Sequence, residues 1–434
     1  MIWNERIECM SREEMRALQS EKLIDLVNRV YNNVDFYRRK MDEIGIKPSD
    51  IQSIDDIIKL PFTYKSDLRD HYPFGMFAVP MQKIVRLHAS SGTTGKPTTV
   101  GYTHNDIANW GEALARCLTM AGISSHDVMQ VSYGYGLFTG GLGVHYGAET
   151  VGCTVIPISG GNTRRQLQLM SDFGSTVLAC TPSYALHLAD ALSENGYSLR
   201  DMKLQIGVFG AEPWTENMRL ELEKKWGIKA FDIYGLSEIM GPGVANDCEF
   251  HAGLHVNEDH FFPEIVHPNT KTPLSDGEEG ELVFTTLTKE GIPLLRYNTR
   301  DLSILNHKKC ACGRTTVRMN KITGRSDDML IIRGVNLFPS QIEHVLLEMG
   351  ETSAHYLLLV DKENNLDTLE LEVELDESKM VDTIKDLQML SRKIENAMNS
   401  AIGLSVKVTL VEPKTIARSE GKAIRVIDNR KLRN

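Results

Sequence analysis

The stretch STVLACTPSYALHLADALSENG, residues 175–196, joins a short apolar run to a segment with helical spacing of its apolar residues. TRRQLQLMSDFG before it (163–174) also has helical spacing, and KLQIGVFG after it (203–210) is typical of a buried strand. A further helical pattern follows around 216–226. Strands that alternate with helices of this length predict an α/β protein with a mostly parallel sheet.

Two changes of pattern follow this region. EIVHP and GELVFTTL, within residues 264–287, are separated by a polar turn and predict a small antiparallel subdomain beside the main sheet. After GRSDD (324–328) come two strand patterns, a long amphipathic helix at about 378–401 and a third strand pattern. We therefore expect an α/β N-terminal domain over 1–325 and a small α+β C-terminal domain over 326–434.

Composition limits the possible functions. The chain has 434 residues and a formal net charge of -10, which argues against broad binding to a nucleic acid backbone. The opening MIWNERIECM does not resemble a signal peptide, and no apolar run reaches the 18 residues of a membrane span. We expect a soluble cytoplasmic protein with neither a membrane nor a nucleic acid as partner, and with its seven cysteines reduced.

SSGTTGKP, residues 90–97, is the densest chemical signal. Its glycines let the backbone approach a ligand, and its hydroxyls and lysine suit a polyphosphate; the residues concerned are Ser90, Ser91, Gly92, Thr93, Thr94, Gly95 and Lys96. A Walker A loop would need Gly at position 90 and Ser or Thr at position 97, where this chain has Ser90 and Pro97. A solvated Ser/Thr/Gly turn remains the alternative.

SSGTTGKP resembles the phosphate-binding loop of the adenylate-forming superfamily, and further matching motifs follow in the superfamily's order. These are DIYGLSE (232–238), YNTRD (297–301), the hinge-like GRSDD (324–328) and the lysine of ARSEGKAIR (417–425). PFTYKSDLRDHYPFG, YGYGLFTGGLG, FGAEPW, IYGLSEIMGPG and RSDDMLIIRGVNLFPSQIE are most similar to the phenylacetate–CoA ligase family. The matched positions extend from about residue 85 to residue 425.

The resemblance implies an enzyme that ligates a small aryl-acetic acid, phenylacetate first, to coenzyme A. Such an enzyme forms an acyl-adenylate from ATP and releases AMP and pyrophosphate. An enzyme that loads a carrier-protein thiol, or that acts on indoleacetate or benzoate, remains an alternative, as does a non-catalytic nucleotide-binding relative. The family expectation is also a homodimer with a mobile C-terminal domain.

The resemblance also assigns roles to individual residues. Catalysis is expected from Lys422, Glu238 (which also holds magnesium), Lys96 and Thr94, because negative charge gathers on the phosphate oxygens during adenylation. Besides the phosphate loop, the nucleotide is expected to contact Gly210, Ala211, Glu212, Pro213, Asp232, Ile233, Tyr234, Gly235, Ser237, Asp301 and Arg325. Lys422 could act only if the C-terminal domain closed over the ATP site.

The acid and CoA sites are assigned in the same way. Tyr133, Tyr135, Gly136, Phe138 and Ala211 are the expected acid-binding residues, although an aromatic run alone indicates core packing as readily as a pocket. Asp327 is the expected hinge, and Arg333, Gly334 and Asn336 are expected on the CoA side. Lys65 and Arg69 are candidates for contact with the phosphates or CoA.

A structural metal site is suggested by the cysteine spacing. Cys310 and Cys312 flank one alanine in a turn, and Cys248 lies upstream in a polar stretch that also contains two histidines. Three thiolates and one imidazole would complete a tetrahedral zinc site with no open position. His255 is preferred as the fourth ligand, with His251 as the alternative.

Overall fold

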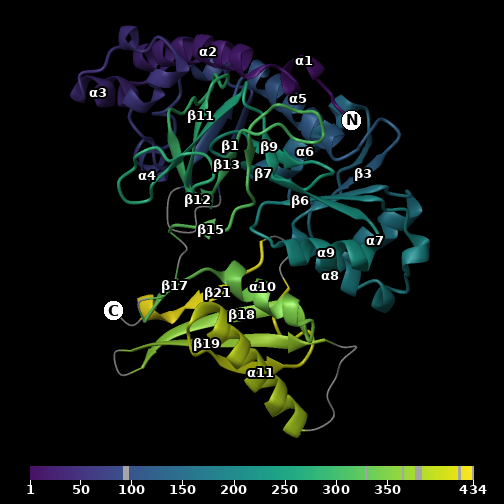
Figure 1. The fold of residues 1–434 in the computed structure, drawn as a ribbon. Helices are drawn as coiled ribbons and strands as arrows, with labels where there is room; N and C mark the ends of the chain where they lie inside the picture. Colours follow the sequence, from purple (N-terminus) through teal and green to yellow (C-terminus); the bar gives the residue numbers. More distant parts are fainter. Residues whose placement is uncertain are drawn as a thin grey trace.

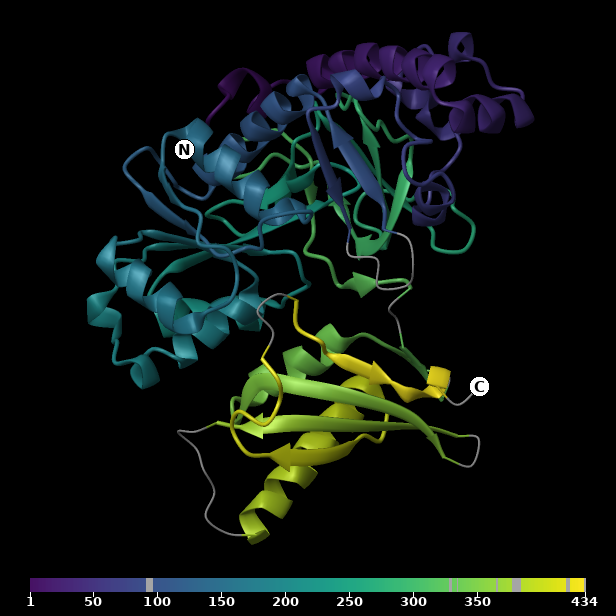
Figure 2. The same ribbon diagram turned by 180° about the vertical axis from the view of Figure 1, so that it is seen from behind.

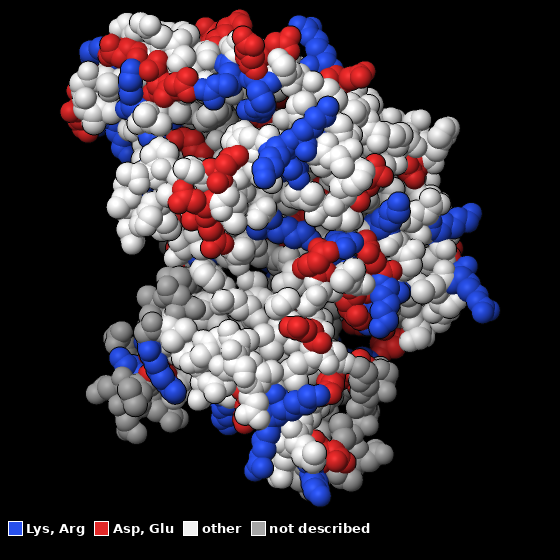
Figure 3. Space-filling model, viewed as in Figure 1, with Lys and Arg blue, Asp and Glu red and all other residues white. Residues whose placement is uncertain are grey.

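A computed structural model gives the fold and describes residues 1–90, 97–327, 330–333, 335–363, 366–376, 384–418 and 422–432. The chain forms a large N-terminal unit and a smaller C-terminal unit below it (Figure 1). Acidic and basic side chains are intermixed over both units on the face shown in Figure 3. Within the described residues, no helix has both the length and the apolar character needed to cross a membrane.

The central sheet of the N-terminal unit has nine strands among the described residues. Five are parallel neighbours, namely β7 (Lys229–Leu236), β6 (Ile206–Gly210), β5 (Val177–Cys180), β3 (Val128–Val131) and β4 (Thr154–Ile156). Beyond β7 the order continues antiparallel through β8 (Gly241–Asp247), β9 (Leu254–Val256), β14 (Arg318–Met319) and β13 (Leu305–Asn306). The predicted α/β class with a mostly parallel sheet is confirmed.

Helices cover both faces of this sheet. They are α5 (His104–Met120), α6 (Thr139–Val151), α7 (Thr163–Asp172), α8 (Pro182–Asp190) and α9 (Glu216–Trp226). Alternate residues of β5 point to opposite faces of the sheet. Val177 and Ala179 pack in the core shared with α5 and α6. Leu178 and Cys180 pack with α7, α8 and α9 instead. The nearly continuous apolar run in β5 therefore results from burial on both sides.

The expected antiparallel subdomain is confirmed. It is a four-stranded sheet of β10 (Phe261–Val266), β11 (Gly280–Thr286), β12 (Tyr297–Ser303) and β15 (Gly324–Arg325) among the described residues. β1 (Arg86–Ala89) and β2 (Thr99–Tyr102) pair antiparallel on either side of the phosphate-loop sequence. The helices α1 (Glu5–Glu8), α2 (Arg12–Asn33), α3 (Asp35–Glu43) and α4 (Lys65–Asp70) complete the N-terminal unit, and short 3₁₀ helices lie at Pro48–Asp50, Ile54–Lys59, Met81–Lys83, Ser193–Asn195 and Leu199–Asp201.

The C-terminal unit has its own sheet and its own apolar core. Its elements are β16 (Leu330–Ile332), β17 (Val335–Leu337), α10 (Pro339–Met349), β18 (Thr352–Glu363), β19 (Leu366–Leu375), α11 (Ile384–Ile402), β20 (Lys407–Val411), β21 (Val426–Asp428) and a 3₁₀ helix at Asn429–Leu432. Seen from behind, the sheet lies in front of α10 and α11, so both helices cover one of its faces (Figure 2). The pattern predicted for this unit lacks β16, β17, α10 and β21. β21 joins the edge of the sheet by pairing parallel with β18.

Candidate active site

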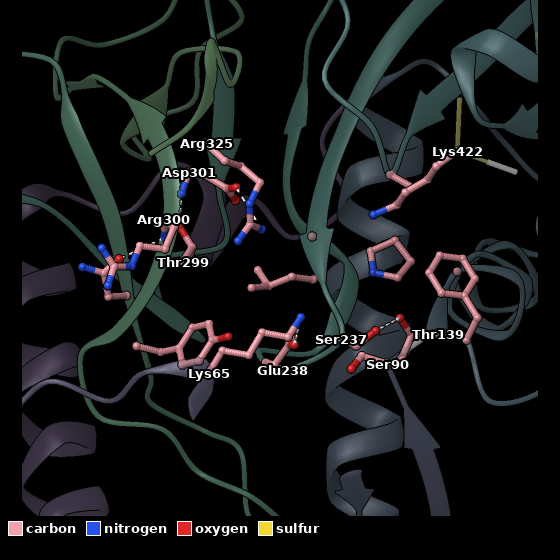
Figure 4. A pocket seen from close by; sticks show the side chains of 18 of the residues that line it. Lys65, Ser90, Thr139, Ser237, Glu238, Thr299, Arg300, Asp301, Arg325 and Lys422 are labelled. Atoms are coloured by element: carbon pink, nitrogen blue, oxygen red, sulfur yellow. Dashed lines mark hydrogen bonds and ion pairs between the residues drawn. The ribbon is translucent and has the colours of Figure 1, made fainter. Parts of the chain in front are cut away.

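A cavity of about 360 Å³ lies where the loop after β7, the strand β12 and the C-terminal unit meet. A smaller cavity of about 140 Å³ adjoins it and shares Ala211, Asp301, Arg325 and Lys422 with it. Lys422 comes from the C-terminal unit, whereas the other three residues belong to the N-terminal unit. Figure 4 shows Lys422 on one side of the larger cavity, with Glu238, Asp301 and Arg325 on the others.

The Glu238 carboxylate lies at the wall of the larger cavity and has only 6% of its side chain exposed. Lys65 Nζ is 3.1 Å from Glu238 Oε1, and the Thr98 hydroxyl donates to the same oxygen at 3.2 Å. The hydroxyls of Thr98 and Ser90 are 2.6 Å apart. These groups compensate the charge of a buried carboxylate that borders open space, and carboxylate oxygens are among the ligands that Mg²⁺ prefers.

A buried lysine supports the backbone at Glu238. Lys289 Nζ donates to the carbonyl oxygens of Glu238 at 3.2 Å and Ile239 at 2.8 Å. Burial lowers the pKa of Lys289 to about 7. We did not predict this residue, because TLTKEGIP around it has the composition of an exposed turn.

A second acidic centre lies between β7 and β12. The Tyr234 hydroxyl donates to Asp301 Oδ2 at 2.6 Å, and Arg325 Nη1 is 3.7 Å from Asp301 Oδ1. Arg325 also makes a two-point contact with Asp327, at 2.9 and 3.0 Å. Burial raises the pKa of Asp301 to about 6, and it raises the pKa of Asp232, at the smaller cavity, to about 6 as well.

Most of the described residues that were predicted for the site line these two cavities. The larger cavity is lined by Ser90, Tyr133, Phe138, Ala211, Ile233, Gly235, Ser237, Glu238, Asp301, Arg325, Asp327 and Lys422, and the smaller one adds Glu212, Pro213, Asp232 and Tyr234. The larger cavity is also lined by residues that were not predicted for the site, namely Tyr64, Ser66, Thr139, Gly140, Leu236, Pro242, Tyr297, Asn298, Thr299 and Arg300. Lys65, named only as a candidate, lines it too.

Four predicted site residues lie apart from the two cavities. The Tyr135 hydroxyl is 3.2 Å from His145 Nδ1, and neither Tyr135 nor the neighbouring Gly136 lines the cavities. Gly210 packs against β7, where an added Cβ would lie 2.1 Å from the Ile233 carbonyl oxygen. Arg333 donates to the Asp367 carbonyl oxygen within the C-terminal unit.

Part of the predicted site lies outside the described residues. This holds for Ser91, Gly92, Thr93, Thr94, Gly95, Lys96 and Gly334, and for the side chain of Asn336. Ser90 and Thr98, whose hydroxyls contact each other, lie on either side of residues 91–96 of the phosphate-loop sequence. Both lie beside Glu238, so the two ends of that sequence are at the cavity.

The four predicted metal ligands lie together away from this cavity. One potential ligand atom from each of Cys248, His255, Cys310 and Cys312 falls within 4.8 Å of all the others. The Cys248 and Cys310 sulfurs are 3.8 Å apart, and Cys312 Sγ is 3.5 Å from His255 Nε2. His255 Nδ1 contacts the Thr316 hydroxyl at 2.9 Å, whereas His251 pairs with Asp247.

Two sulfurs that each bind a tetrahedral zinc ion at about 2.3 Å lie about 3.8 Å apart. The Cys248–Cys310 separation of 3.8 Å therefore fits such an ion. The contact between His255 Nδ1 and Thr316 orients the ring so that Nε2 faces the cysteines. The donor set and its spacing fit zinc, with His255 in the position of the fourth ligand.

Two family models match the chain. That of AMP-binding enzymes covers residues 70–287, and that of the AMP-binding enzyme C-terminal domain covers residues 334–430. Among solved structures, 2-hydroxyisobutyryl-CoA ligase in the postadenylation state, in complex with 2-HIB-AMP, is 30% identical, with a TM-score of 0.93 over 98% of this chain and 92% of that chain. The same ligase in the thioesterification state, with 2-HIB-AMP and CoA, gives a TM-score of 0.72 at the same identity and coverage.

Curated relatives match over nearly the full length. The phenylacetate-coenzyme A ligase of Escherichia coli is 52% identical over 98% of this chain and 97% of its own length. The phenylacetate-coenzyme A ligase of Thermus thermophilus is 50% identical over 99% of this chain and 100% of its own length. Together with the two family models, these identities show that the chain belongs to the AMP-binding enzyme family, within its phenylacetate-coenzyme A ligase group.

Proposed function

We propose that this protein is an AMP-forming ligase that joins phenylacetate to coenzyme A through phenylacetyl-adenylate. The observation that carries the proposal is that Lys422, Glu238 and Asp301 line one cavity. Lys422 belongs to the C-terminal unit, whereas Glu238 and Asp301 belong to the N-terminal unit. Full-length identity of about 50% to phenylacetate-coenzyme A ligases supports the choice of acid and thiol.

The first half-reaction forms the adenylate. A carboxylate oxygen of the acid attacks the α-phosphorus of ATP, and the bond from that phosphorus to the bridging oxygen of pyrophosphate breaks. Lys422 brings positive charge to the cavity where negative charge builds up on the phosphate oxygens. Glu238 is the proposed magnesium ligand, and the bound ion would neutralise polyphosphate charge. The loop Ser91–Lys96 is assigned to the polyphosphate from its sequence.

The nucleotide and the acid are assigned to different walls of the cavity. Asp301 is proposed to accept hydrogen bonds from the ribose hydroxyls, with Arg325 beside it, while Tyr234 offers a face for the adenine. Tyr133 and Phe138, with Ala211 near the carboxylate, are proposed to enclose the phenyl ring. An aromatic wall beside open backbone suits a flat aryl group.

The second half-reaction transfers the acyl group. The CoA sulfur attacks the carbonyl carbon of the adenylate, the bond from that carbon to the AMP oxygen breaks, and the thiol proton is lost to solvent. We propose that residues 1–325 and 326–434 are separate domains and that the C-terminal domain turns about Asp327 between the two steps. Arg333, Gly334 and Asn336 are the proposed CoA-side residues. The higher TM-score against the postadenylation state supports assigning the present arrangement to the adenylation side of the cycle.

We further propose a structural zinc ion held by Cys248, His255, Cys310 and Cys312. Their ligand atoms lie close enough together to enclose one ion, and the set leaves no open position for catalysis. A homodimer and a cytoplasmic location are proposed as well; the dimer follows the family expectation, and the location follows from the use of ATP and CoA.

Pyrophosphate release tests the function. Native protein and Lys422→Ala are assayed with magnesium-ATP and a panel of acids, including phenylacetate, indoleacetate and benzoate, each with and without CoA. The expected result is CoA-dependent turnover that is highest with phenylacetate and that Lys422→Ala lowers by at least about 100-fold, as expected when one group that stabilises transition-state charge is lost. Adenylation without any effect of CoA would instead indicate a carrier-protein thiol as the acceptor.

A further inference from the structure

Glu212 is bonded to both structural units at once. One carboxylate oxygen accepts from the backbone N–H of Ser183 at 2.8 Å, in the first turn of α8. The other oxygen accepts from the backbone N–H of Ala423 at 2.9 Å, directly after Lys422. The carboxylate therefore ties the N-terminal unit to the backbone that carries the lysine.

A second contact between the two units involves Thr215, three residues after Glu212. Glu343 of α10 is buried, and its carboxylate accepts from the Thr215 backbone N–H at 3.3 Å and from its hydroxyl at 3.1 Å. Arg425 Nη2 is 3.6 Å from the same carboxylate. The turn from Glu212 to Thr215 is thus linked directly to Ala423 and, through Glu343, to Arg425.

These contacts belong to one orientation of the C-terminal unit. The whole-chain TM-score is 0.93 against the postadenylation state of 2-hydroxyisobutyryl-CoA ligase and 0.72 against its thioesterification state, at equal identity. A hydrogen bond between Glu212 and Ala423 requires the lysine-bearing segment to lie against α8 and the turn after β6. A large reorientation of the C-terminal unit would separate these groups.

We propose that Glu212 is a positioning residue that docks the Lys422 segment at the cavity for adenylate formation and releases it for thioester formation. The proposal rests on the proposed function. Hydrogen bonds that involve a charged group are the stronger ones, so the docking contact can favour one domain orientation. Only the half-reaction that needs Lys422 at the cavity should depend on it.

The test compares Glu212→Gln with native protein in each half-reaction. Glutamine is nearly the same size, but its amide group faces one of the two N–H donors and cannot accept from it. Phenylacetate-dependent exchange of pyrophosphate into ATP is expected to fall about 10- to 100-fold, a range set by the loss of one charged hydrogen bond. Both carboxylate oxygens of Glu212 are bonded to backbone N–H groups, so its side chain is assigned to docking and not to the adenylate. Thioester formation from saturating synthetic phenylacetyl-adenylate and CoA is therefore expected to stay within about twofold of native.

Two further variants accompany this comparison. Glu343→Gln should reproduce the same split, because it weakens the other contact of the turn. Glu194→Gln is the matched control, since its ion pair with Lys414 also crosses the boundary but is about half exposed on both sides. That variant should leave both half-reactions unchanged.

The outcomes separate the two proposals. Equal loss of both half-reactions in Glu212→Gln would show a merely structural role, and no loss in either would remove the docking role. Small-angle scattering of the native protein and of Glu212→Gln reports domain orientation without any catalysis, and identical profiles would likewise overturn the docking proposal. If the native protein itself catalyses neither half-reaction with phenylacetate, the proposed function fails, and the scattering comparison still decides the role of Glu212.

Discussion

Asp301 combines burial with a position beside the proposed nucleotide, so its charge should control binding. Its pKa is raised to about 6 by burial, and the carboxylate is therefore ionised above pH 6 and protonated below it. We expect native protein to bind adenosine about tenfold more tightly than Asp301→Asn at pH 7.5, since a hydrogen bond to an ionised group contributes about 1.5–3 kcal/mol. The ratio of the two affinities should approach one as the pH falls through 6, as measured by calorimetry.

Adenosine is chosen because it lacks the phosphates, whose own titration would obscure that of Asp301. Asp232 also has its pKa raised to about 6 by burial, but it is present in both proteins and its effect cancels in the ratio. A ratio that stays constant between pH 5 and pH 7.5 would contradict the assignment of Asp301 to the ribose.

Lys289 offers a prediction about stability at the same scale. Its pKa is about 7 in the folded protein and about 10.4 in an unfolded chain, so between these values the unfolded chain binds more protons. The contribution of Lys289 to the free energy of unfolding therefore rises with pH between these two pKa values, by at most about 1.4 kcal/mol per pH unit. We expect the Tm of native protein minus that of Lys289→Met to increase from pH 7 to pH 9, as measured by scanning calorimetry.

The two residues differ in how far their sequence revealed them. Asp301 was predicted because it stands in YNTRD, one of several motifs that follow in the order of the adenylate-forming superfamily. Lys289 has no such local signal, because its partners are two backbone carbonyls about 50 residues away. Tyr135 was predicted for the site and lies apart from it. Its aromatic and glycine-rich surroundings predict a pocket, but they do not determine where its hydroxyl points.

The segment that carries Cys310 and Cys312 has no helix or strand, and contacts with distant parts of the chain hold it in place. Arg314 Nε donates to Glu8 Oε2 at 2.5 Å, and the Thr315 hydroxyl donates to the Met10 carbonyl oxygen at 2.6 Å. A zinc ion on Cys310 and Cys312 would fix this segment to β9 through His255, beside its contacts with Glu8 of α1. Loss of the ion should therefore destabilise the N-terminal unit more than it affects the chemical steps.

Metal analysis tests this expectation directly. Native protein should contain stoichiometric zinc, and Cys312→Ala should lose the ion and several degrees in Tm, whereas substrate affinities measured below the new Tm should change little. Cys9→Ala is the control, because Cys9 lies near this segment but outside the cluster of four. Equal Tm in native protein and Cys312→Ala would argue against a structural ion.

Elements with a strong local pattern were predicted more accurately than those defined by distant pairing. The helix expected around residues 216–226 is α9, Glu216–Trp226, whose N-cap Thr215 and C-terminal Gly227 mark its ends in the sequence. β21 was not predicted, because three residues are too few for a pattern and their strand partners lie in β18. The long helix predicted from about residue 378 is observed as α11 from Ile384, with residues 377–383 outside the described chain.

At the scale of the whole molecule, the two units share the candidate active site, and each has an apolar core of its own. Ala354 of β18 also joins the apolar cluster around α7, α8 and α9. Gly324 and Arg325 still belong to the sheet with β12, and β16 begins at Leu330 in the other unit. Any rotation of one unit against the other must therefore be absorbed by the few residues between these strands. Asp327 lies among them, and its carboxylate contacts Arg325 of the N-terminal unit.

Restriction of the backbone at Asp327 should consequently separate the two half-reactions. Proline fixes φ near −65°, so Asp327→Pro should hinder the rotation that thioester formation requires while leaving one orientation accessible. We expect phenylacetate-dependent exchange of pyrophosphate into ATP to remain within about threefold of native, and CoA-dependent turnover to fall at least about 100-fold, since a hinge that cannot reorient blocks every later step. Asp327→Ala, which removes the same contact with Arg325 but leaves φ free, should retain both activities. Equal effects of proline and alanine would place the importance of this position in the lost carboxylate and not in the hinge.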